Sequence, residues 1–301
     1  KESFLIIDSV EKSTFKEFKE NTSAVLLAFG FITGNLFQDE YYYQVVKEDY
    51  STIAEATAYF KKEKSIISDV GILSPFEFQQ YLEYFKKEEI LEKISLRLKS
   101  HHLSKISELI STNSTLARSI KLILEGNQTR LLLLRAGIYS IALETITNFI
   151  YEENKSRLKP IPEKKLSQKI IKEFKETLDK YECSISDYGN EILKSKIDNI
   201  NNPTNSSKLS KPFEIYNLRL SQSELLILKH RNKFLHGTSP FSEEELQDKD
   251  NEISYISKKI LTLCNSLILK YCGYDGYIVD YGGYHQLKWQ EKVTEHLFKI
   301  I

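Results

Sequence analysis

The stretch that decides this fold is Leu228-Lys229-His230-Arg231-Asn232-Lys233-Phe234-Leu235-His236-Gly237. At 100° per residue, Ile227, Leu228, Phe234 and Leu235 share one apolar arc of a helix, and Arg231 falls near its middle. A charged side chain on a buried face needs a partner. We therefore expect Arg231 to be either compensated by a carboxylate or held ready for a ligand.

The same helix predicts a second polar pair beside Arg231. Asn232 and His236 are four residues apart and share one face. Ser221 and Glu224 have capping-box spacing, and Gly237 and Pro240 are typical stop signals, so we expect a helix over residues 222–236. Carbonyl groups at the helix end favour imidazolium, whereas Lys229, Arg231 and Lys233 favour neutral imidazole. His236 is thus expected to titrate near neutrality.

Glu144 is the best candidate for a carboxylate facing Arg231, because it interrupts the apolar run 131–150. Asn148 follows four residues later on the same face and is a second supporting candidate. Glu144 could hold the guanidinium in register, or it could only neutralise a buried charge. Lys229 and Lys233 could contact RNA phosphates, although lysines on a helix are commonly solvated surface.

Composition restricts the classes of protein. The 301 residues carry 42 basic and 42 acidic side chains, so no overall field marks a nucleic-acid coat or a membrane-surface protein. The three cysteines, Cys183, Cys264 and Cys272, form no metal or disulfide motif, which favours a reducing cytoplasm and no metal or other cofactor. No signal peptide is visible, and Arg135 and Glu144 break the longest apolar run, so no membrane contact is expected.

Elements of the N-terminal region, residues 1–115, are expected from periodicity. A short strand is expected at 4–7, and a helix over 14–30 opens with the capping box of Thr14 and Glu17. A second strand is expected at 41–46, and a further helix begins at Ser74-Pro75 and runs towards Ser100.

The C-terminal elements are also expected from periodicity. Helical patterns cover 116–150, 166–181 and 253–271 besides the Arg231 helix, whereas 199–212 is typical of a loop. The strands 277–281 and 284–287 are expected to form a hairpin around Gly282-Gly283. The fold class is therefore mainly α: a helical bundle with a small β-hairpin over 116–287, preceded by a mostly helical region with a short strand element and followed by a helix or tail over 288–301.

The motif itself resembles a known family. Arg231-Asn232-Lys233-Phe234-Leu235-His236-Gly237 is similar to the Arg-Asn-x-x-x-His-Gly signature of the HEPN superfamily, specifically of ApeA-like HEPN proteins. Residues 131–135 with 142–144 resemble the first long helix of that family, and 273–277 resemble the aromatic segment after its last helix. The resemblance covers about residues 116–287, and Arg-x-x-x-x-His alone would be a weak signal.

The resemblance implies a metal-independent endoribonuclease of a bacterial phage-defence or toxin-like system. It implies a homodimer through the HEPN-like domain that brings two motifs into one cleft, with RNA as substrate and a phage-derived or cellular trigger. In these roles Arg231 binds phosphate and stabilises charge, His236 is general base or acid, and Asn232 orients His236 or the phosphate. Residues 1–115 would then sense or regulate.

Two other classes of function stay open. A noncatalytic HEPN module could bind RNA or a nucleotide, or serve only for dimerisation, because buried polarity at a helix end can persist without turnover. A metal hydrolase is disfavoured, because the six histidines are dispersed and no metal-ligand spacing accompanies the acidic residues.

Overall fold

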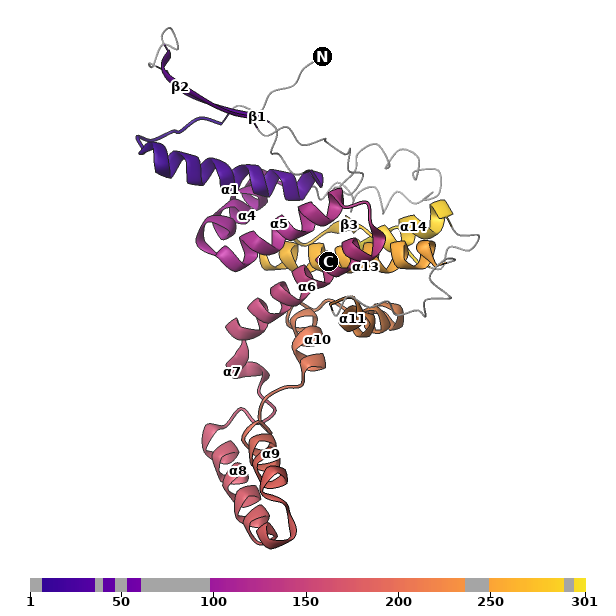
Figure 1. Cartoon of the computed structure of the whole chain (residues 1–301). Helices are drawn as coiled ribbons and strands as arrows, with labels where there is room; N and C mark the ends of the chain where they lie inside the picture. Colours follow the sequence, from indigo (N-terminus) through magenta and orange to yellow (C-terminus); the bar gives the residue numbers. More distant parts are fainter. Residues whose placement is uncertain (1–6, 36–39, 47–52, 61–97, 236–248, 290–294) are drawn as a thin grey trace. The chain divides into compact units, whose positions relative to one another are not determined.

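The computed structural model of the chain shows a mainly helical protein with two small antiparallel sheets, which confirms the expected fold class (Figure 1). The described residues are 7–35, 40–46, 53–60, 98–235, 249–289 and 295–301. In this part of the chain, no helix has both the length and the apolar character needed to cross a membrane.

The chain divides into two compact units. The first unit combines residues 1–146 with 222–301, and the second comprises 147–221. These units do not coincide with the expected ranges 1–115, 116–287 and 288–301, which remain a prediction from sequence. Each unit is described by itself.

Helix α1 (Phe15–Thr33) opens the first unit with the expected capping box. The Thr14 side chain accepts a hydrogen bond from the Glu17 N–H at 3.3 Å, and the Glu17 carboxylate accepts one from the Thr14 N–H at 2.8 Å. The helix continues past the expected end at Gly30 and is capped by Gly34 in the left-handed region, with φ of 78°. A Cβ is disfavoured in that conformation, so a glycine favours the stop there.

Strands β1 (Glu40–Val46) and β2 (Ile53–Phe60) pair antiparallel, which confirms the strand expected at 41–46. The expected strand at 4–7 falls outside the described residues except for Ile7. The helix expected from Ser74 also falls outside them up to residue 97.

Three helices follow in sequence: α4 (Ser100–Thr112), α5 (Ser114–Gln128) and α6 (Leu132–Glu153). The helical pattern expected over 116–150 is confirmed but is interrupted at 129–131. Buried polar contacts tie α1, α5 and α6 together. The Tyr139 hydroxyl donates to Asn127 Oδ1 at 2.7 Å, and Asn127 Nδ2 donates to the carbonyl of Gly34 at 3.0 Å.

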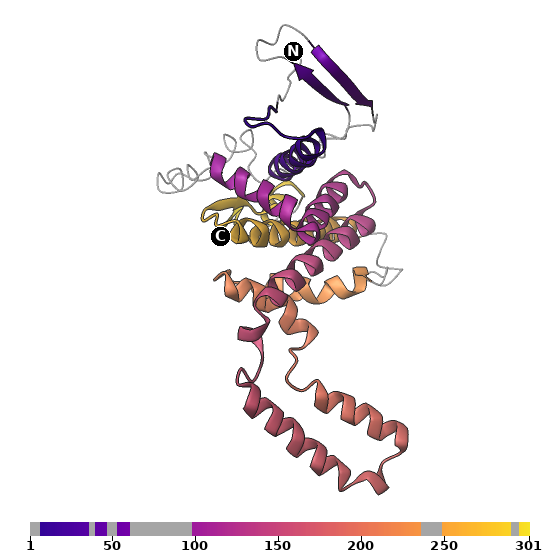
Figure 2. The same cartoon turned by 90° about the vertical axis from the view of Figure 1, so that its left-hand side faces the viewer.

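The expected Arg231 helix and the last long helix are both present, as α11 (Gln222–Leu235) and α13 (Asp250–Tyr271). Figure 2 shows the same elements from a second side. Helix α13 is the centre of the first unit, because its residues 259–269 are all buried. It contacts both α11 and the following helix α14 (Tyr281–Trp289).

The small C-terminal sheet is confirmed, but its second strand was predicted wrongly. Strand β3 (Tyr277–Val279) pairs with β4 (Phe298–Ile300), and residues 284–287 lie in helix α14 instead. Gly282 and Gly283 serve close packing, not a turn. A Cβ at Gly282 would lie 2.0 Å from Lys259 Cδ, and one at Gly283 would lie 2.1 Å from the carbonyl oxygen of His296.

The second unit contains short helices α7 (Lys155–Leu158) and η1 (Glu182–Ser184) beside α8 (Lys164–Asp179) and α9 (Asp187–Asp198). Helix α8 confirms the helix expected over 166–181. The loop expected at 199–212 is wrong in its second half, because α10 (Asn205–Ile215) covers it. The Thr204 hydroxyl caps α10 and the side chains of Leu209 and Phe213 are buried, which outweighs the helix-breaking tendency of Pro212.

Candidate functional site

Arg231 lies on the buried face of α11 and is only 4% exposed. Its neighbours on that face are Ile227, Leu228 and Phe234, as the helical periodicity predicts. Helix α6 lies against the same helix, since a Cβ at Gly137 would be 3.6 Å from the carbonyl oxygen of Phe234. A guanidinium is thus held among apolar side chains.

The guanidinium has few partners for its five N–H groups. Arg231 Nη2 donates to Asn232 Oδ1 at 2.7 Å. Glu144 Oε2 lies 3.9 Å from Arg231 Nη1, which is an ion pair too long for a hydrogen bond. Within the described ranges, Arg231 Nε and Nη1 are buried and have no hydrogen-bond partner.

Glu144 compensates Arg231 only in part. Its side chain is 42% exposed, so water shares its charge. Burial lowers the pKa of Arg231, and the Glu144 carboxylate acts in the opposite direction. A guanidinium still remains charged at neutral pH because its intrinsic pKa is very high. Arg231 is therefore a buried cation with N–H groups that no described residue accepts.

The other predicted residues are placed less tightly. Asn232 is exposed and uses its side-chain oxygen for Arg231, so it orients the guanidinium. Lys229 and Lys233 are exposed on α11. Asn148 is an exposed residue of α6 and belongs to the second unit.

His236 and Gly237 lie outside the described residues, so the expected proton-transfer group remains a prediction. Of the predicted site residues, the structure brings together Glu144, Arg231 and Asn232.

His230 lies next to Arg231 and was not among the predicted site residues. Its Nδ1 atom is buried and has no hydrogen-bond partner within the described part of the chain. Burial and nearby Lys233 lower the pKa of His230, while Glu252 acts in the opposite direction. These effects favour a neutral imidazole at pH 7.

A second buried cation occupies the same unit. Lys259 of α13 is 2% exposed. Its Nζ lies 2.8 Å from Asp280 Oδ2, 3.0 Å from Glu295 Oε2 and 3.5 Å from Glu224 Oε1. Three carboxylates from three separate segments therefore surround one ammonium group.

The carboxylates around Lys259 have further partners. Glu224 also pairs with Lys299 of β4. Glu295 Oε1 accepts hydrogen bonds from the Tyr255 hydroxyl at 2.7 Å and from the Ser223 hydroxyl at 2.8 Å. Asp280 Oδ1 accepts one from the Gly282 N–H at 3.0 Å. We call Lys259, Glu224, Asp280, Glu295 and Lys299 the Lys259 cluster.

The carboxylates of the Lys259 cluster compensate the buried charge of Lys259. Burial by itself would lower the pKa of Lys259, but the carboxylates of Asp280, Glu224 and Glu295 outweigh it and raise that pKa. Sequence reasoning missed this cluster. The sequence does contain a signal for Lys259. Like Arg231, it is a charged residue on the apolar face of a predicted helix, between Ile256 and Leu263.

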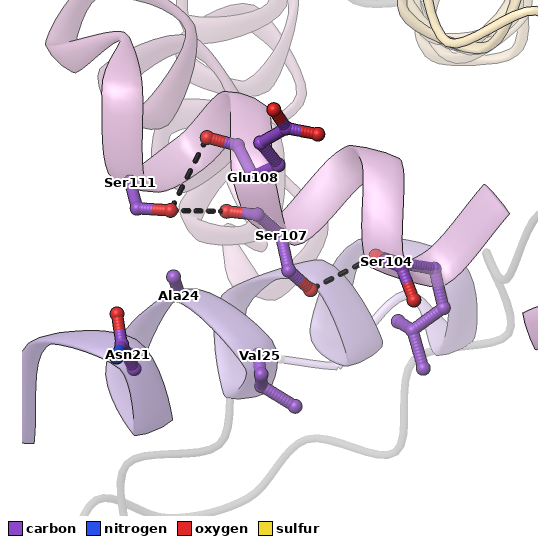
Figure 3. Close-up of a pocket in the computed structure, with 8 residues that line it drawn as sticks. Asn21, Ala24, Val25, Ser104, Ser107, Glu108 and Ser111 are labelled. Carbon is purple, nitrogen blue, oxygen red and sulfur yellow. Dashed lines mark hydrogen bonds between the residues drawn. The ribbon is translucent and has the colours of Figure 1, made fainter. Parts of the chain in front are cut away.

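A groove between α1 and α4 is a third place to consider (Figure 3). It is lined by Asn21, Ala24, Val25, Leu103, Ser104, Ser107, Glu108 and Ser111. The hydroxyls of Ser104, Ser107 and Ser111 donate to carbonyl groups of their own helix at 2.8–3.1 Å. These three hydroxyl protons already have acceptors, so the serines offer no free donor to a ligand in this arrangement.

Neither a search for metal-binding groups nor comparison with known proteins assigns a function to the described residues. In the described ranges, no group of three or more His, Cys, Asp or Glu side chains could hold a metal ion. Comparisons with protein-family models, curated proteins and solved structures find no match. The functional argument therefore depends on Arg231 and on the motif that contains it.

Proposed function

We propose that this chain is a metal-independent endoribonuclease in which Arg231 binds the scissile phosphate. The observation that carries the proposal is a buried guanidinium whose Nε and Nη1 atoms have no hydrogen-bond acceptor among the described residues. Buried polar groups normally have partners, and each exception needs an explanation. A phosphate is such a partner, because two of its oxygens match the planar N–H fork of arginine.

The geometry favours an anionic ligand at this position. Arg231 Nε and Nη1 are the donors left over, while Nη2 is bonded to Asn232. Glu144 is too distant and too exposed to neutralise the cation fully. An RNA phosphate would supply both the charge and the acceptors, and in a partly buried site that interaction is stronger than in water.

The chemistry follows from RNA itself. A base removes the proton of the 2′-hydroxyl, and the 2′-oxygen forms a bond to phosphorus. The bond from phosphorus to the 5′-oxygen breaks, and an acid returns a proton to that leaving oxygen. The products are a 2′,3′-cyclic phosphate and a 5′-hydroxyl. Arg231 would stabilise the charge that develops on the phosphorane oxygens.

His236 is proposed as the proton-transfer group on the strength of the sequence resemblance. One histidine per motif supplies one such group, whereas the reaction needs a base and an acid. A homodimer with two Arg231–His236 motifs in one cleft would supply both. Phage defence or a related toxin-like response is proposed on the same resemblance, with a cytoplasmic RNA as substrate.

The second candidate is a noncatalytic module that binds RNA or a nucleotide. The same observation favours it, since unused donors on Arg231 account for phosphate binding and not for turnover. Binding without cleavage is the property that separates the two candidates.

Incubating the purified chain with structured and single-stranded RNAs in excess chelator tests the proposal. Wild type is compared with Arg231→Ala, Arg231→Lys and His236→Ala, and Arg118→Ala is the matched control because Arg118 is exposed on α5. We expect cleavage with cyclic-phosphate ends in wild type and in the control, and loss of cleavage in the other three. Lysine keeps the charge but lacks the fork.

Each alternative result has a stated meaning. Arg231-dependent RNA binding without cleavage would assign the noncatalytic module. Equal activity in all variants would identify a contaminating nuclease. A chain that neither binds nor cleaves RNA would overturn both candidates.

A further inference from the structure

The α8–α9 hairpin of the second unit has no apolar core of its own. Between residues 164 and 201, all of which are described, the buried residues are Ser167, Asn190 and Asn201. All three are polar. Helices in proteins are stabilised mainly by packing of an apolar face, so this hairpin needs another surface.

The two helices lie side by side and antiparallel (Figure 1), and polar contacts join them along a seam. At one end, Asn201 Nδ2 donates to Ser167 Oγ at 2.8 Å. Lys175 pairs with Asp198 at 2.6 Å, and Asp179 pairs with Lys194 at 3.4 Å. These pairs define which side of each helix faces the other.

Apolar residues directly precede the seam residues on both helices. They are Leu166, Ile170, Phe174 and Leu178 on α8, Leu193 and Ile197 on α9, and Ile200 in the turn that follows α9. The side chain of the preceding residue points 100° away from the seam about the helix axis. Because the two helices are antiparallel, this rotation places the preceding residues of both helices on the same side of the hairpin. The residues directly after the seam residues are polar. They are Gln168, Lys172, Glu176 and Lys180 in and just after α8, and Glu191, Ser195, Asn199 and Asn202 in and just after α9.

The hairpin therefore has one apolar side and one polar side. We define the hairpin face as Leu166, Ile170, Phe174, Leu193, Ile197 and Ile200. Phe174 is 48% exposed, Leu166 is 45% exposed and Ile200 is 44% exposed. Such a contiguous apolar patch marks an interaction surface.

We infer that the hairpin face packs against the same face of a second copy of this chain. Two hairpins that are each apolar on one side then form a four-helix bundle with its core between them. A two-fold axis relates the copies, so the contact is isologous and needs a self-complementary surface.

The charges at the edge of the hairpin face meet that requirement. Glu173 lies beside the apolar residues of α8 and forms a long, exposed ion pair of 3.9 Å with Lys169 of the same helix, and Lys196 lies beside the apolar residues of α9. In the proposed dimer, α8 of one chain lies over α9 of the other chain. Glu173 of each chain then faces Lys196 of the other, so this pair occurs twice. Mixed charges favour a protein surface over an anionic lipid surface, which attracts clusters of basic residues.

The interface is small, so the dimer is expected to be weak. At 1.5 Å per residue α9 is about 18 Å long, and two helices are about 20 Å wide, which gives a footprint of roughly 400 Å². Stable complexes bury about 800 Å² per partner. Dimerisation should therefore depend on concentration. The proposed ribonuclease would also bring two Arg231 motifs together, so the test uses variants of the hairpin face, which belong to the second unit and leave that motif unchanged.

Sedimentation of the full chain over a micromolar to submillimolar range tests the inference. We expect the mass to rise from 35.1 kDa towards twice that value in wild type. The variant Phe174→Glu with Leu193→Glu should have a lower average mass than wild type at each concentration. Tyr188→Glu is the matched control, because Tyr188 is 75% exposed on α9 but lies off the hairpin face. Circular dichroism checks that the helices are retained.

A charge swap tests the arrangement. Glu173→Lys alone and Lys196→Glu alone should each weaken the dimer, and the double variant should restore it. A wild-type mass of one chain throughout would overturn the inference, and so would a dimer unaffected by the glutamates or failure of the double swap. Phe174-dependent binding to vesicles of phosphatidylserine and phosphatidylcholine would assign the face to lipid instead.

Discussion

Arg231 and Lys259 are both buried cations of the first unit, yet their surroundings are opposite. Lys259 has three carboxylates within 3.5 Å, whereas Arg231 has one at 3.9 Å. Helix α11 contributes to both sites, since Glu224 and Arg231 are two turns apart on its buried face. The comparison separates a cation whose charge is matched by carboxylates from a cation with buried N–H groups that have no acceptor among the described residues.

The largest expected effect comes from removing the satisfied cation. Lys259→Met leaves the buried carboxylates of Glu224 and Asp280 and the partly buried one of Glu295 without their central partner. Breaking a buried ionic group typically costs about 3–5 kcal/mol. Urea unfolding measures this loss. Lys121→Met is the control, since Lys121 is 57% exposed and pairs with Glu125 at 3.9 Å, and about 0–1 kcal/mol is expected. A similar small loss for Lys259→Met would show that the Lys259 cluster is not structural.

Gly282→Ala should destabilise the Lys259 cluster, although Gly282 is not a member of it. The added Cβ would lie 2.0 Å from Lys259 Cδ, so the lysine or α14 must move. We expect a loss of about 1–3 kcal/mol, as for overpacking elsewhere. Gly137→Ala is the matched control, because its Cβ would meet only an ordinary contact of 3.6 Å from the Phe234 carbonyl oxygen. Equal unfolding midpoints for the two variants would contradict the prediction.

Arg231→Met should separate stability from binding. The change removes a buried charge without adequate partners, so stability should shift by less than about 1 kcal/mol and could rise. RNA binding should fall by about 10-fold or more, since a hydrogen bond to a charged group contributes about 1.5–3 kcal/mol. Unfolding curves and RNA titrations of the same samples test this. A large loss of stability would place Arg231 with Lys259 as a structural cation.

The smallest effect is expected for Glu144→Gln. The carboxylate is 42% exposed and 3.9 Å from the guanidinium, so stability should change by less than about 1 kcal/mol. Glu144 also competes with phosphate for Arg231, so RNA binding should tighten severalfold. Weaker binding by a folded variant would instead show that Glu144 positions the guanidinium for RNA.

Local sequence patterns predicted the buried Arg231 and its neighbour Glu144, but they did not predict the Lys259 cluster. Arg231 stands out because its helix is apolar around it, and Glu144 stands out for the same reason on α6. Both are visible within a window of a few turns. The pairing of Arg231 with Asn232 joins adjacent residues and is equally local.

The Lys259 cluster could not be assembled from such windows. Its members come from α11, α13, the turn before α14 and the segment around β4. Only the tertiary fold brings these segments together. The partner of β3 was misassigned for a related reason. Gly282-Gly283 resembled a turn, but the glycines allow contact with Lys259 and His296 that sequence spacing does not reveal.

The placement of Arg231 also bears on how this protein can vary between organisms. A residue that is retained for folding alone, as we expect for Lys259, says little about activity. A buried guanidinium with N–H groups that no described residue accepts is expected to contribute little stability or to lower it. Drift would then readily replace it with methionine or leucine. Retention of an arginine at position 231 in diverged chains would thus be a signature of selection on ligand binding.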